Sequence, residues 1–481
     1  MSLYEGIIAV NSVLWGKWGV YTLLATGVYA SICLKFFHFA HTRLCVKKTL
    51  CACNKGNTDQ SNSLSPFQTL CTSLAATIGV GNITGVASAI SIGGPGAVFW
   101  MWVAALFGMM TKYSEIVLGI YFRRKNFNGK WSGGAMYYLR DGVGSIKGMN
   151  LAGKLLAGMF ALFTVLTSLG MGCIGQINKI VINMVSAFPS SSISQYNHSL
   201  IWGVTLFFLA GIIVAGGLKR VAAFSEKIVP VMVVCFIGGS VLVLLKNSSR
   251  IIPAISSIFT NAFTPQAGVG GAWGTVFSRV CMQGFKRGVF SNEAGLGSSV
   301  LVHSSTSVRE PCEQGMWGIV EVFIDTILIC SITALVILTS GVYSANVSDA
   351  TMLAKAFSLT YGSLGEYFVA LTILVFAFTS VITWNQYGSV AWEYMFGTSC
   401  TYVYKVLHVS LIVPASIMTS DLAWEISDIF NGLMMIPNLI GIILLMGTVK
   451  KITNNYIDRT LGKKKILPVV SFFSNMYNKT K

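Results

Sequence analysis

Two polar, glycine-containing segments interrupt apolar stretches of the sequence and are the first candidates for chemistry. The first runs Ala75-Ala-Thr-Ile-Gly-Val-Gly-Asn-Ile-Thr-Gly85, and the second runs Val280-Cys-Met-Gln-Gly-Phe-Lys-Arg-Gly288. Glycine inside a helix costs about 1 kcal/mol relative to alanine, so closely spaced glycines let the backbone leave the helix. The freed N–H groups then face an anion, and the freed carbonyl oxygens face a cation. The alternative is that the glycines only permit close packing of helices.

The composition around these segments is that of a membrane protein. Of the 481 residues, 53% are hydrophobic and 11% are charged, and the mean hydropathy is +0.67, whereas soluble domains are about 25% charged. The net charge of +17 is divided among short segments between apolar stretches, which argues against a nucleic-acid partner. The 11 cysteines are scattered along the sequence, so we expect reduced thiols and no disulfide framework. Cys45, Cys51 and Cys53 do not form a zinc site, because no further His or Cys follows at zinc-ligand spacing.

Eleven apolar stretches predict an all-α polytopic membrane protein, because about 20 apolar residues cross a bilayer as a helix. They are 17–38, 66–92, 95–122, 154–184, 199–217, 227–246, 270–303, 314–340, 364–395, 400–419 and 430–449. The segments on one predicted side hold 26 Lys and Arg, against Lys246, Arg250 and Lys355 on the other. The positive-inside rule therefore predicts an N-terminus outside and a C-terminus in the cytoplasm. The first stretch lacks the basic start and cleavage site of a signal peptide, so we expect a retained helix.

The two interrupted stretches lie five spans apart. If the first span is an additional helix, they open two halves of five spans each, and the odd number inverts the second half. We expect residues 1–65 to form the additional helix and a basic cytoplasmic loop, 66–250 and 251–449 to form the two repeats, and 450–481 to form a basic cytoplasmic tail. Interrupted helices in corresponding positions of inverted repeats are typical of the binding site of a secondary transporter.

Several blocks of the sequence resemble the alanine/glycine:cation symporter family, over roughly residues 10–450. They are Thr77-Ile-Gly-Val-Gly-Asn-Ile-Thr-Gly-Val-Ala87, Gly93-Gly-Pro-Gly-Ala-Val-Phe-Trp-Met-Trp102, Lys112-Tyr-Ser-Glu115, Gly133-Gly-Ala-Met-Tyr-Tyr138 and Arg287-Gly-Val-Phe-Ser-Asn-Glu-Ala-Gly-Leu-Gly297. The resemblance implies a sodium-coupled importer of small amino acids with the leucine-transporter-type fold, preceded by one extra helix. The sequence departs from the family pattern at Gln283, where an aromatic residue is usual, and in the run Ser298-Ser-Val-Leu301.

In such a transporter the first interruption supplies groups for both ends of an amino acid. The backbone amides of Val80 and Gly81, beside Gly79, suit the substrate carboxylate. The amide oxygen of Asn82 and the carbonyl of Thr77 suit sodium, a hard cation that prefers oxygen ligands. Thr77 is also expected among the substrate-binding residues. Asn82 also suits a cap on the second half-helix, and the two roles are compatible.

Gln176 is an uncharged polar residue inside the fourth predicted span. Such residues usually face the interior of a helix bundle. Its position in the family implies that it hydrogen-bonds the substrate, and the alternative is that it ties helices together. We expect that tying role for Asn178 and Asn183.

Thr379 and Ser380 place two adjacent hydroxyls in the ninth predicted span. With the carbonyls near Ala75 and Ile78, they would complete a second sodium site of the leucine-transporter type. The alternative is that each hydroxyl bonds only to a carbonyl of its own helix.

The size of the pocket is predicted from two further segments. We expect the pocket for the substrate side chain to be lined by Trp384, one turn beyond Ser380, and by the predicted turn Met282-Gln283-Gly284. Such a pocket would admit only small amino acids. For Trp384, an ordinary packing role is the alternative.

Acidic residues in or near spans need a partner or an interface, because a charge inside the membrane is costly. They are Glu115, Glu321, Asp325 and Glu393, and we expect no proton relay among them. Lys112, three residues before Glu115, is its expected partner. Ser291-Asn292-Glu293 is expected to serve as a cytoplasmic gate or loop anchor and not in binding.

The sequence therefore predicts a sodium symporter of small neutral amino acids (alanine, glycine). The alternatives are a proton-coupled or other small-amino-acid permease and an ion channel, although a channel would need a ring of filter elements. An enzyme is not expected, since the sequence has no Gly-x-Ser-x-Gly elbow, His-rich metal set or paired carboxylates on one helix. We expect no cofactor, sodium as the coupling ion, and a functional monomer in the plasma (inner) membrane.

Overall fold

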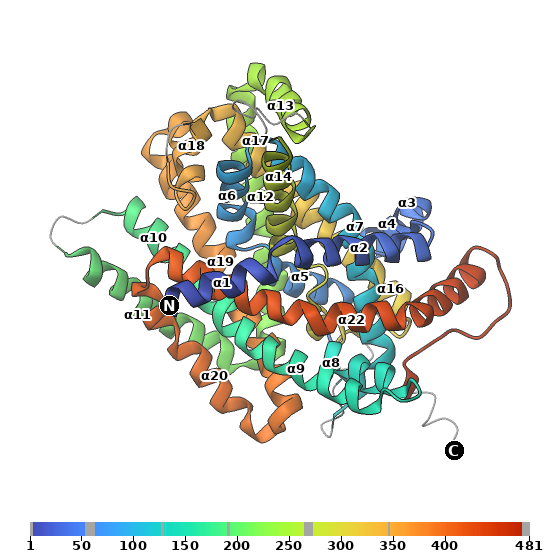
Figure 1. Cartoon of the computed structure of the whole chain (residues 1–481). Coiled ribbons are helices and arrows are strands. Elements are labelled where there is room, and N and C mark those ends of the chain that lie inside the picture. Colours follow the sequence, from blue (N-terminus) through green and yellow to red (C-terminus); the bar gives the residue numbers. More distant parts are fainter. Residues whose placement is uncertain are drawn as a thin grey trace.

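The computed structural model describes residues 3–52, 63–126, 129, 131–189, 193–263, 273–344 and 347–473. In these residues helices form the bundle, and the strands are β1 (Arg124–Lys125) and β2 (Trp131–Ser132), which pair antiparallel. The predicted all-α polytopic class is confirmed (Figure 1). Cys53 lies outside the described residues.

The helices through residue 246 are α1 (Leu3–Leu14), α2 (Lys17–Cys33), α3 (Phe37–Ala40), α4 (Thr42–Lys48), α5 (Pro66–Thr77), α6 (Thr84–Gly93), α7 (Gly96–Phe122), α8 (Ala135–Tyr137), α9 (Asn150–Leu169), α10 (Gln176–Ala187), α11 (Gln195–Ala215) and α12 (Gly217–Lys246). The later helices are α13 (Ile251–Phe263), α14 (Trp273–Asn292), α15 (Val300–His303), α16 (Pro311–Val322), α17 (Ser331–Ser340), α18 (Met352–Tyr361), α19 (Ser363–Phe396), α20 (Thr401–Ser410), α21 (Ile412–Ile417) and α22 (Ser420–Thr460). Two π-helical turns, η5 (Gly170–Gly175) and η7 (Phe323–Cys330), continue α9 into α10 and α16 into α17.

Eight helical stretches of the described chain are long and apolar enough to cross a membrane. They are Gly96–Phe122, Asn150–Ala187, Gln195–Ala215, Gly217–Lys246, Pro311–Ser340, Ser363–Phe396, Thr398–Ile417 and Glu425–Thr460. Each overlaps one of the eleven predicted stretches. The other three predicted stretches correspond to α2, which has only 17 residues, and to the two interrupted helices.

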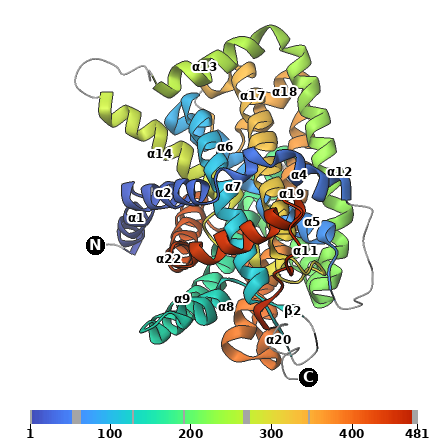
Figure 2. The ribbon, with the colours of Figure 1, turned by 90° about the vertical axis from the view of Figure 1, so that its right-hand side faces the viewer.

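The spans differ in how deeply they lie in the bundle. In the most apolar window of α7, 83% of the residues are buried, against 22% in that of α11. Helix α7 is therefore central, and α11 presents most of its surface outward. Figures 1 and 2 show α13 and α18 at one end of the bundle, and α8 and α20 at the opposite end.

The first interruption lies where the glycine pattern predicts it. Helix α5 begins with a capping box, in which Ser65 Oγ accepts from the Gln68 amide at 3.0 Å and Gln68 Oε1 accepts from the Ser65 amide at 3.1 Å. The helix ends at Thr77, a 3-10 turn η2 covers Val80–Asn82, and α6 resumes the helix at Thr84.

The second interruption was predicted in the wrong place. Helix α14 continues through Met282, Gln283 and Gly284 to Asn292, so no turn exists at those three residues. A methyl group at Gly284 would lie 2.4 Å from the Ala97 carbonyl oxygen. This glycine therefore permits α14 to pack closely on α7, which was the alternative explanation.

The chain instead leaves the helix between α14 and α15. Glu293, Gly295 and Gly297 have φ angles of 56°, 93° and 73°, a left-handed backbone that glycine adopts most readily. Consequently Lys286 and Arg287, two of the 26 cations counted on the cytoplasmic side, lie within α14. Lys286 Nζ is 2.5 Å from Asp428 Oδ2 of α22, which offsets its charge.

Side chains from α7 and α22 bind the second interruption. Glu115 Oε1 accepts from the amides of Gly295 at 2.9 Å and Gly297 at 3.2 Å. Asn438 Nδ2 donates to the same Glu115 oxygen at 2.6 Å and to the Gly295 carbonyl at 2.8 Å. These bonds satisfy backbone groups that would otherwise be unpaired inside the bundle.

The predicted ion pair between Glu115 and Lys112 is replaced by another pair. Lys112 Nζ is 3.1 Å from Glu321 Oε1 of α16 and donates to the Asn292 carbonyl at 3.0 Å. Ser73 and His303 also hydrogen-bond the Glu321 carboxylate, at 2.7 and 3.0 Å. Glu321 therefore joins the two interrupted helices, a long-range contact that residue spacing does not reveal.

Glu115→Ala should destabilise the fold, because it leaves two buried backbone amides without an acceptor. An unsatisfied buried donor costs roughly 1–3 kcal/mol, so we expect a clear fall in the unfolding temperature of the purified protein in detergent. Glu366→Ala, at the half-buried start of α19, is the matched control and should change little. Equal unfolding temperatures for the Glu115 variant and the control would contradict this role.

Candidate functional site

The first interruption contacts α10 and α19 through two polar side chains. Gln176 Oε1 accepts from the Val80 amide at 3.1 Å. A methyl group at Gly79 would lie 2.6 Å from Ser380 Oγ and 2.9 Å from Gln176 Oε1, so a side chain there would displace both polar groups. The structure thus brings together five residues predicted for the site, Gly79, Val80, Gln176, Ser380 and, as described next, Asn82.

Asn82 has a defined orientation at the centre of this site. Its Oδ1 accepts from the Gly79 amide at 3.0 Å, while its Nδ2 donates to Asp325 Oδ1 of η7 at 2.7 Å. The Asp325 carboxylate requires the donor end of the amide, so the oxygen faces the unwound backbone. This oxygen is the predicted sodium ligand, and in the structure it also caps the interruption.

The second interruption reaches the same centre, which corrects the expectation for Ser291-Asn292-Glu293. All three residues are buried. Ser291 Oγ donates to Asp325 Oδ2 at 2.9 Å, and a methyl group at Gly81 would lie 3.3 Å from the Ser291 Cα. The three residues were assigned to a cytoplasmic gate because the helix was predicted to break about ten residues too early.

The hydroxyls predicted for a second sodium site differ in their contacts. Ser380 Oγ is 2.9 Å from the Ala75 carbonyl and 3.1 Å from the Ala76 carbonyl, at the end of α5. Thr379 Oγ1 donates at 2.8 Å to the Phe376 carbonyl of its own helix. Ser380 Oγ also bonds to the Phe376 carbonyl of its own helix, at 3.2 Å. Ser380 therefore joins α19 to the freed carbonyls, whereas Thr379 shows only the self-bonded arrangement among these carbonyl contacts.

Thr77 and Ile78 end α5 beside these groups. Thr77 Oγ1 bonds back to the Ser73 carbonyl at 3.3 Å, and Ile78 caps the helix, with its amide bonded to the Leu74 carbonyl at 2.7 Å. Their own carbonyls belong to the turn where the helix ends. They are the backbone oxygens that sequence reasoning assigned to sodium.

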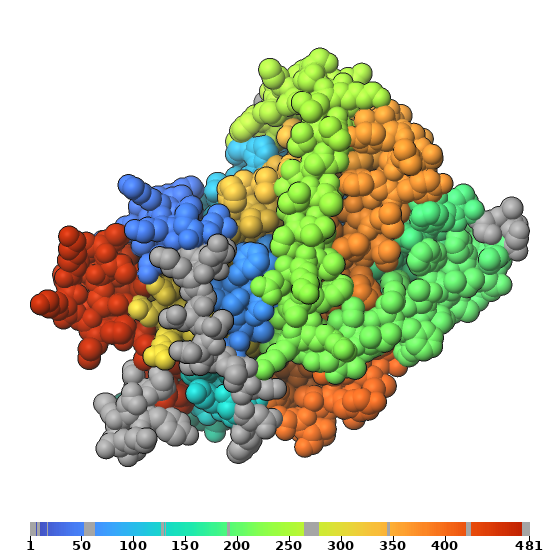
Figure 3. Space-filling view, turned by 180° about the vertical axis from the view of Figure 1, so that it is seen from behind, coloured from blue at the N-terminus to red at the C-terminus, as the bar shows by residue number. Residues whose placement is uncertain are grey.

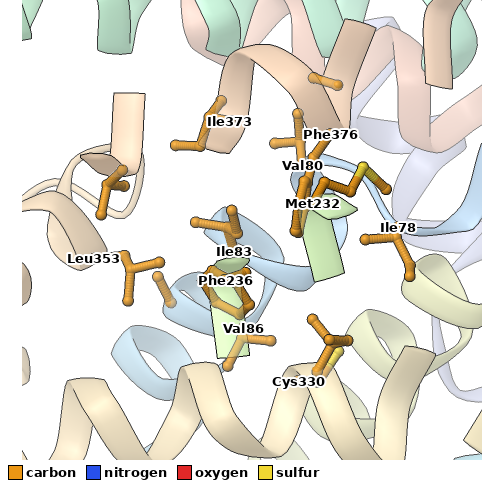
Figure 4. Close-up of a cluster of buried hydrophobic side chains, with 14 of the residues drawn as sticks. Ile78, Val80, Ile83, Val86, Met232, Phe236, Cys330, Leu353, Ile373 and Phe376 are labelled. Carbon is orange, nitrogen blue, oxygen red and sulfur yellow. The ribbon is translucent and has the colours of Figure 1, made fainter. Parts of the chain in front are cut away.

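Apolar side chains enclose the polar centre on one side. Figure 4 shows Val80, Ile83 and Val86 of the first interrupted helix beside residues of α12, α18 and α19. The labelled neighbours on these three helices are Met232, Phe236, Leu353, Ile373 and Phe376. A polar centre lined by apolar side chains is typical of a site for a small organic ligand.

Trp384 lies one turn beyond Ser380 and packs on the π-helical turn η5. It is fully buried, and a methyl group at Gly172 would lie 2.3 Å from its Cβ. The ring of Tyr387 meets the Trp384 ring edge-on, with centroids 5.1 Å apart. The missing side chain at Gly172 is therefore what allows this indole to approach η5.

The three residues of the predicted turn face other parts of the bundle. Gln283 Cβ lies 3.2 Å from the position of a methyl group at Gly93, at the far end of α6. Gly93 is about 14 Å along α6 from Thr84, given a rise of 1.5 Å per residue. Met282 packs against the cluster of Val20, Ala104 and Phe285, and Gly284 lies against α7. The three residues therefore gain no contact that supports their predicted role.

Sequence reasoning named Trp384 for the pocket wall but missed other buried polar side chains of α19 and α22. Thr383 Oγ1, Trp384 Nε1 and both amide atoms of Asn385 and Asn431 have no hydrogen-bond partner among the described residues. Asn431 is two helical turns from Asn438 and shares its face of α22. Unpaired buried polar groups usually bind water or a ligand, and an Asn inside a span was the available signal.

The fold and site define a class of protein. A membrane-spanning helical bundle in which two interrupted helices meet at a buried polar centre is typical of a secondary transporter. The chain shares its fold with MhsT, solved in complex with L-phenylalanine: the TM-score is 0.53 at 13% identity, over 82% of this chain and 99% of that one. This is the leucine-transporter-type fold that was expected.

The chain belongs to the sodium:alanine symporter family, whose sequence profile matches residues 1–470. It is 37% identical to the sodium/alanine symporter AgcS of Methanococcus maripaludis, over 93% of this chain and 96% of that protein. It is 36% identical to an uncharacterized transporter of Haemophilus influenzae, over 95% and 97% of the two chains. A probable sodium/glutamine symporter of Bacillus subtilis, GlnT, is 34% identical over 94% and 91%.

The chain is therefore a multi-pass membrane transporter, a sodium-coupled amino-acid symporter and not an enzyme. Its family implies sodium as the coupling ion. The Asn82 and Ser380 oxygens and the freed carbonyls of α5 are the hard donors that sodium prefers, so the residues present suit this ion.

Gln176→Ala should raise the apparent substrate constant more than tenfold in proteoliposome uptake. The side chain holds the Val80 amide, and an unpaired polar group in a closed site costs about 1–3 kcal/mol. Asn178→Ala is a matched control, because Asn178 Nδ2 donates to the Met418 carbonyl at 2.7 Å and thus ties helices. We expect that variant to lose stability and keep its affinity. Unchanged affinity with lowered stability in the Gln176 variant would assign Gln176 the tying role.

Proposed function

We propose that this protein imports alanine and glycine together with sodium, by alternating access to the site between the two interruptions. The observation that carries the proposal is the orientation of Asn82, whose oxygen faces the unwound backbone while its nitrogen is held by Asp325. A sodium ion there would draw the carboxylate of an amino acid toward the amides of Val80 and Gly81, and the carboxylate would replace Gln176 Oε1 as the acceptor of the Val80 amide. Cation and substrate would then bind cooperatively, as symport requires.

The energetics favour import under an ordinary membrane potential. One sodium ion crossing about 100 mV releases roughly 2.3 kcal/mol. A tenfold concentration ratio costs about 1.4 kcal/mol, so one ion supports an accumulation of nearly two powers of ten.

We propose a monomer in the plasma (inner) membrane, with the N-terminus outside and the C-terminus inside.

A small side-chain pocket supports alanine and glycine as substrates. Trp384 is fixed between Gly172 and Tyr387, and Val80 packs among large apolar side chains. Such a wall cannot move far without strain, so it would exclude branched side chains.

We further propose the domain division at residues 65, 250 and 449, although helix α22 continues without a break to Thr460.

Proton coupling is the second candidate, and one observation favours it. Asp325 is a fully buried carboxylate directly bonded to Asn82. Uptake of labelled alanine into proteoliposomes in sodium, lithium and choline media separates the candidates. If an imposed pH gradient drives alanine uptake in choline medium, the coupling ion is the proton and not sodium.

Asn82→Ala should abolish the sodium dependence of uptake. It removes one oxygen ligand from the ion, while the interruption loses a capping bond of about 1 kcal/mol. The measurement is alanine uptake against sodium concentration, with the unfolding temperature as a check on folding. Asn183→Ala is the control, since Asn183 bonds to the Lys179 carbonyl of its own helix. A sodium dependence equal to that of the unmodified protein would remove Asn82 from the ion site.

Trp384→Ala should admit larger substrates and weaken alanine by the lost contact, on the order of 1–3 kcal/mol. The measurement is competition of labelled alanine uptake by glycine, serine, valine and leucine in both proteins. In the unmodified protein glycine and serine should compete and leucine should not. Strong inhibition by leucine there would refute the small pocket, and an unaltered order in the variant would leave Trp384 with packing alone.

A further inference from the structure

A groove on the outer surface of the bundle lies between α11 and α20, away from the transport site. Figure 3 shows these helices side by side, α11 in green and α20 in orange. The groove has a volume of about 340 Å³. Its lining residues are Phe207, Gly211, Val214, Ala215, Thr401, Tyr402, Lys405, Val406, Val409 and Ser410.

The rim of this groove is an apolar surface that faces the bilayer. Phe208 and Ile212 of α11 are 62% and 64% exposed, and Tyr402 and Val403 of α20 are 74% and 61% exposed. Large apolar side chains so exposed on spanning helices contact lipid. The occupant of the groove therefore comes from the bilayer, and an acyl chain fits its apolar walls.

Two cations converge at the end of the groove where α11 turns into α12. Arg220 Nη1 donates to the Ile212 carbonyl at 2.9 Å, so its guanidinium folds back over the end of α11. Lys405 Nζ lies 3.8 Å from the position of a methyl group at Gly217, the second residue after the end of α11. Lys219 follows two residues later. Tyr402 stands at the same end, where aromatic side chains mark the headgroup level of a membrane.

We propose that this groove, with Lys405 and Arg220 at its mouth, binds an anionic phospholipid. One acyl chain lies between α11 and α20, and the lipid phosphate lies at the two cations. Basic pockets between spanning helices bind anionic headgroups in this way, and the arginine fork matches phosphate oxygens. The lipid also fills a gap beside α20, so its binding stabilises the folded protein.

The test uses the full-length protein in nanodiscs of phosphatidylcholine, with or without phosphatidylglycerol. Phosphatidylglycerol should raise the unfolding temperature by a few degrees, and native mass spectrometry should detect retained phosphatidylglycerol. The double variant Lys405→Gln/Arg220→Gln should lose more than half of both effects. Lys154→Gln, an exposed lysine of α9, is the matched charge control and should keep them.

Gly211→Leu tests the acyl chain separately, because it fills the groove without removing a charge. A methyl group at Gly211 meets only Val409, at 3.9 Å, so the helices need not move. This variant should lose bound lipid as the double variant does. Full lipid retention by both variants overturns the proposal, and so does an equal loss in Lys154→Gln. Inorganic phosphate reproducing the stabilisation in phosphatidylcholine nanodiscs would show a phosphate site instead of a lipid site.

Discussion

Backbone that leaves a helix inside a membrane must find hydrogen-bond partners, and this constraint organises the whole molecule. At the first interruption the partners are Asn82 and Gln176, which take the amides of Gly79 and Val80. At the second they are Glu115 and Asn438. Asn82 belongs to the interruption itself, whereas Gln176, Glu115 and Asn438 come from three other helices. Satisfying the two interruptions therefore fixes the relative positions of α7, α10 and α22.

Buried charge follows from the same constraint. A carboxylate accepts several amide donors at once, which suits it to an unwound loop. A buried carboxylate charge then needs compensation, and at Glu321 the ion pair with Lys112 supplies it. Asp325 lacks such an ion pair among the described residues and is held by neutral donors from Asn82, Ser291 and Thr326. The centre between the interruptions is therefore rich in negative potential, which favours a cation there.

The sequence predicts the spans well, because the length and hydropathy of a span are local properties. The first interruption is likewise found from its two glycines and Asn82. The second is not, because Gly284 and Gly295 are the same residue in different roles: one permits α14 to approach α7, and the other adopts a positive φ. That difference lies in tertiary contacts. Long-range partners such as Asp325 for Asn82 and Glu321 for Lys112 are equally invisible to spacing, whereas the polar residues Gln176 and Ser380 stand out against their apolar helices.

Helix α22 has 41 residues, which makes it about 60 Å long, twice the hydrocarbon thickness of a bilayer. Pro437 interrupts its hydrogen bonding next to Asn438, so the natural hinge of this rod coincides with its contact to the second interruption. The segment from Asn438 to Thr460 is then a lever arm of about 33 Å. Tyr456 and Arg459 near its end bond to Glu313 and Glu310 at the start of α16, so a tilt at the hinge would carry the start of this neighbouring helix with it.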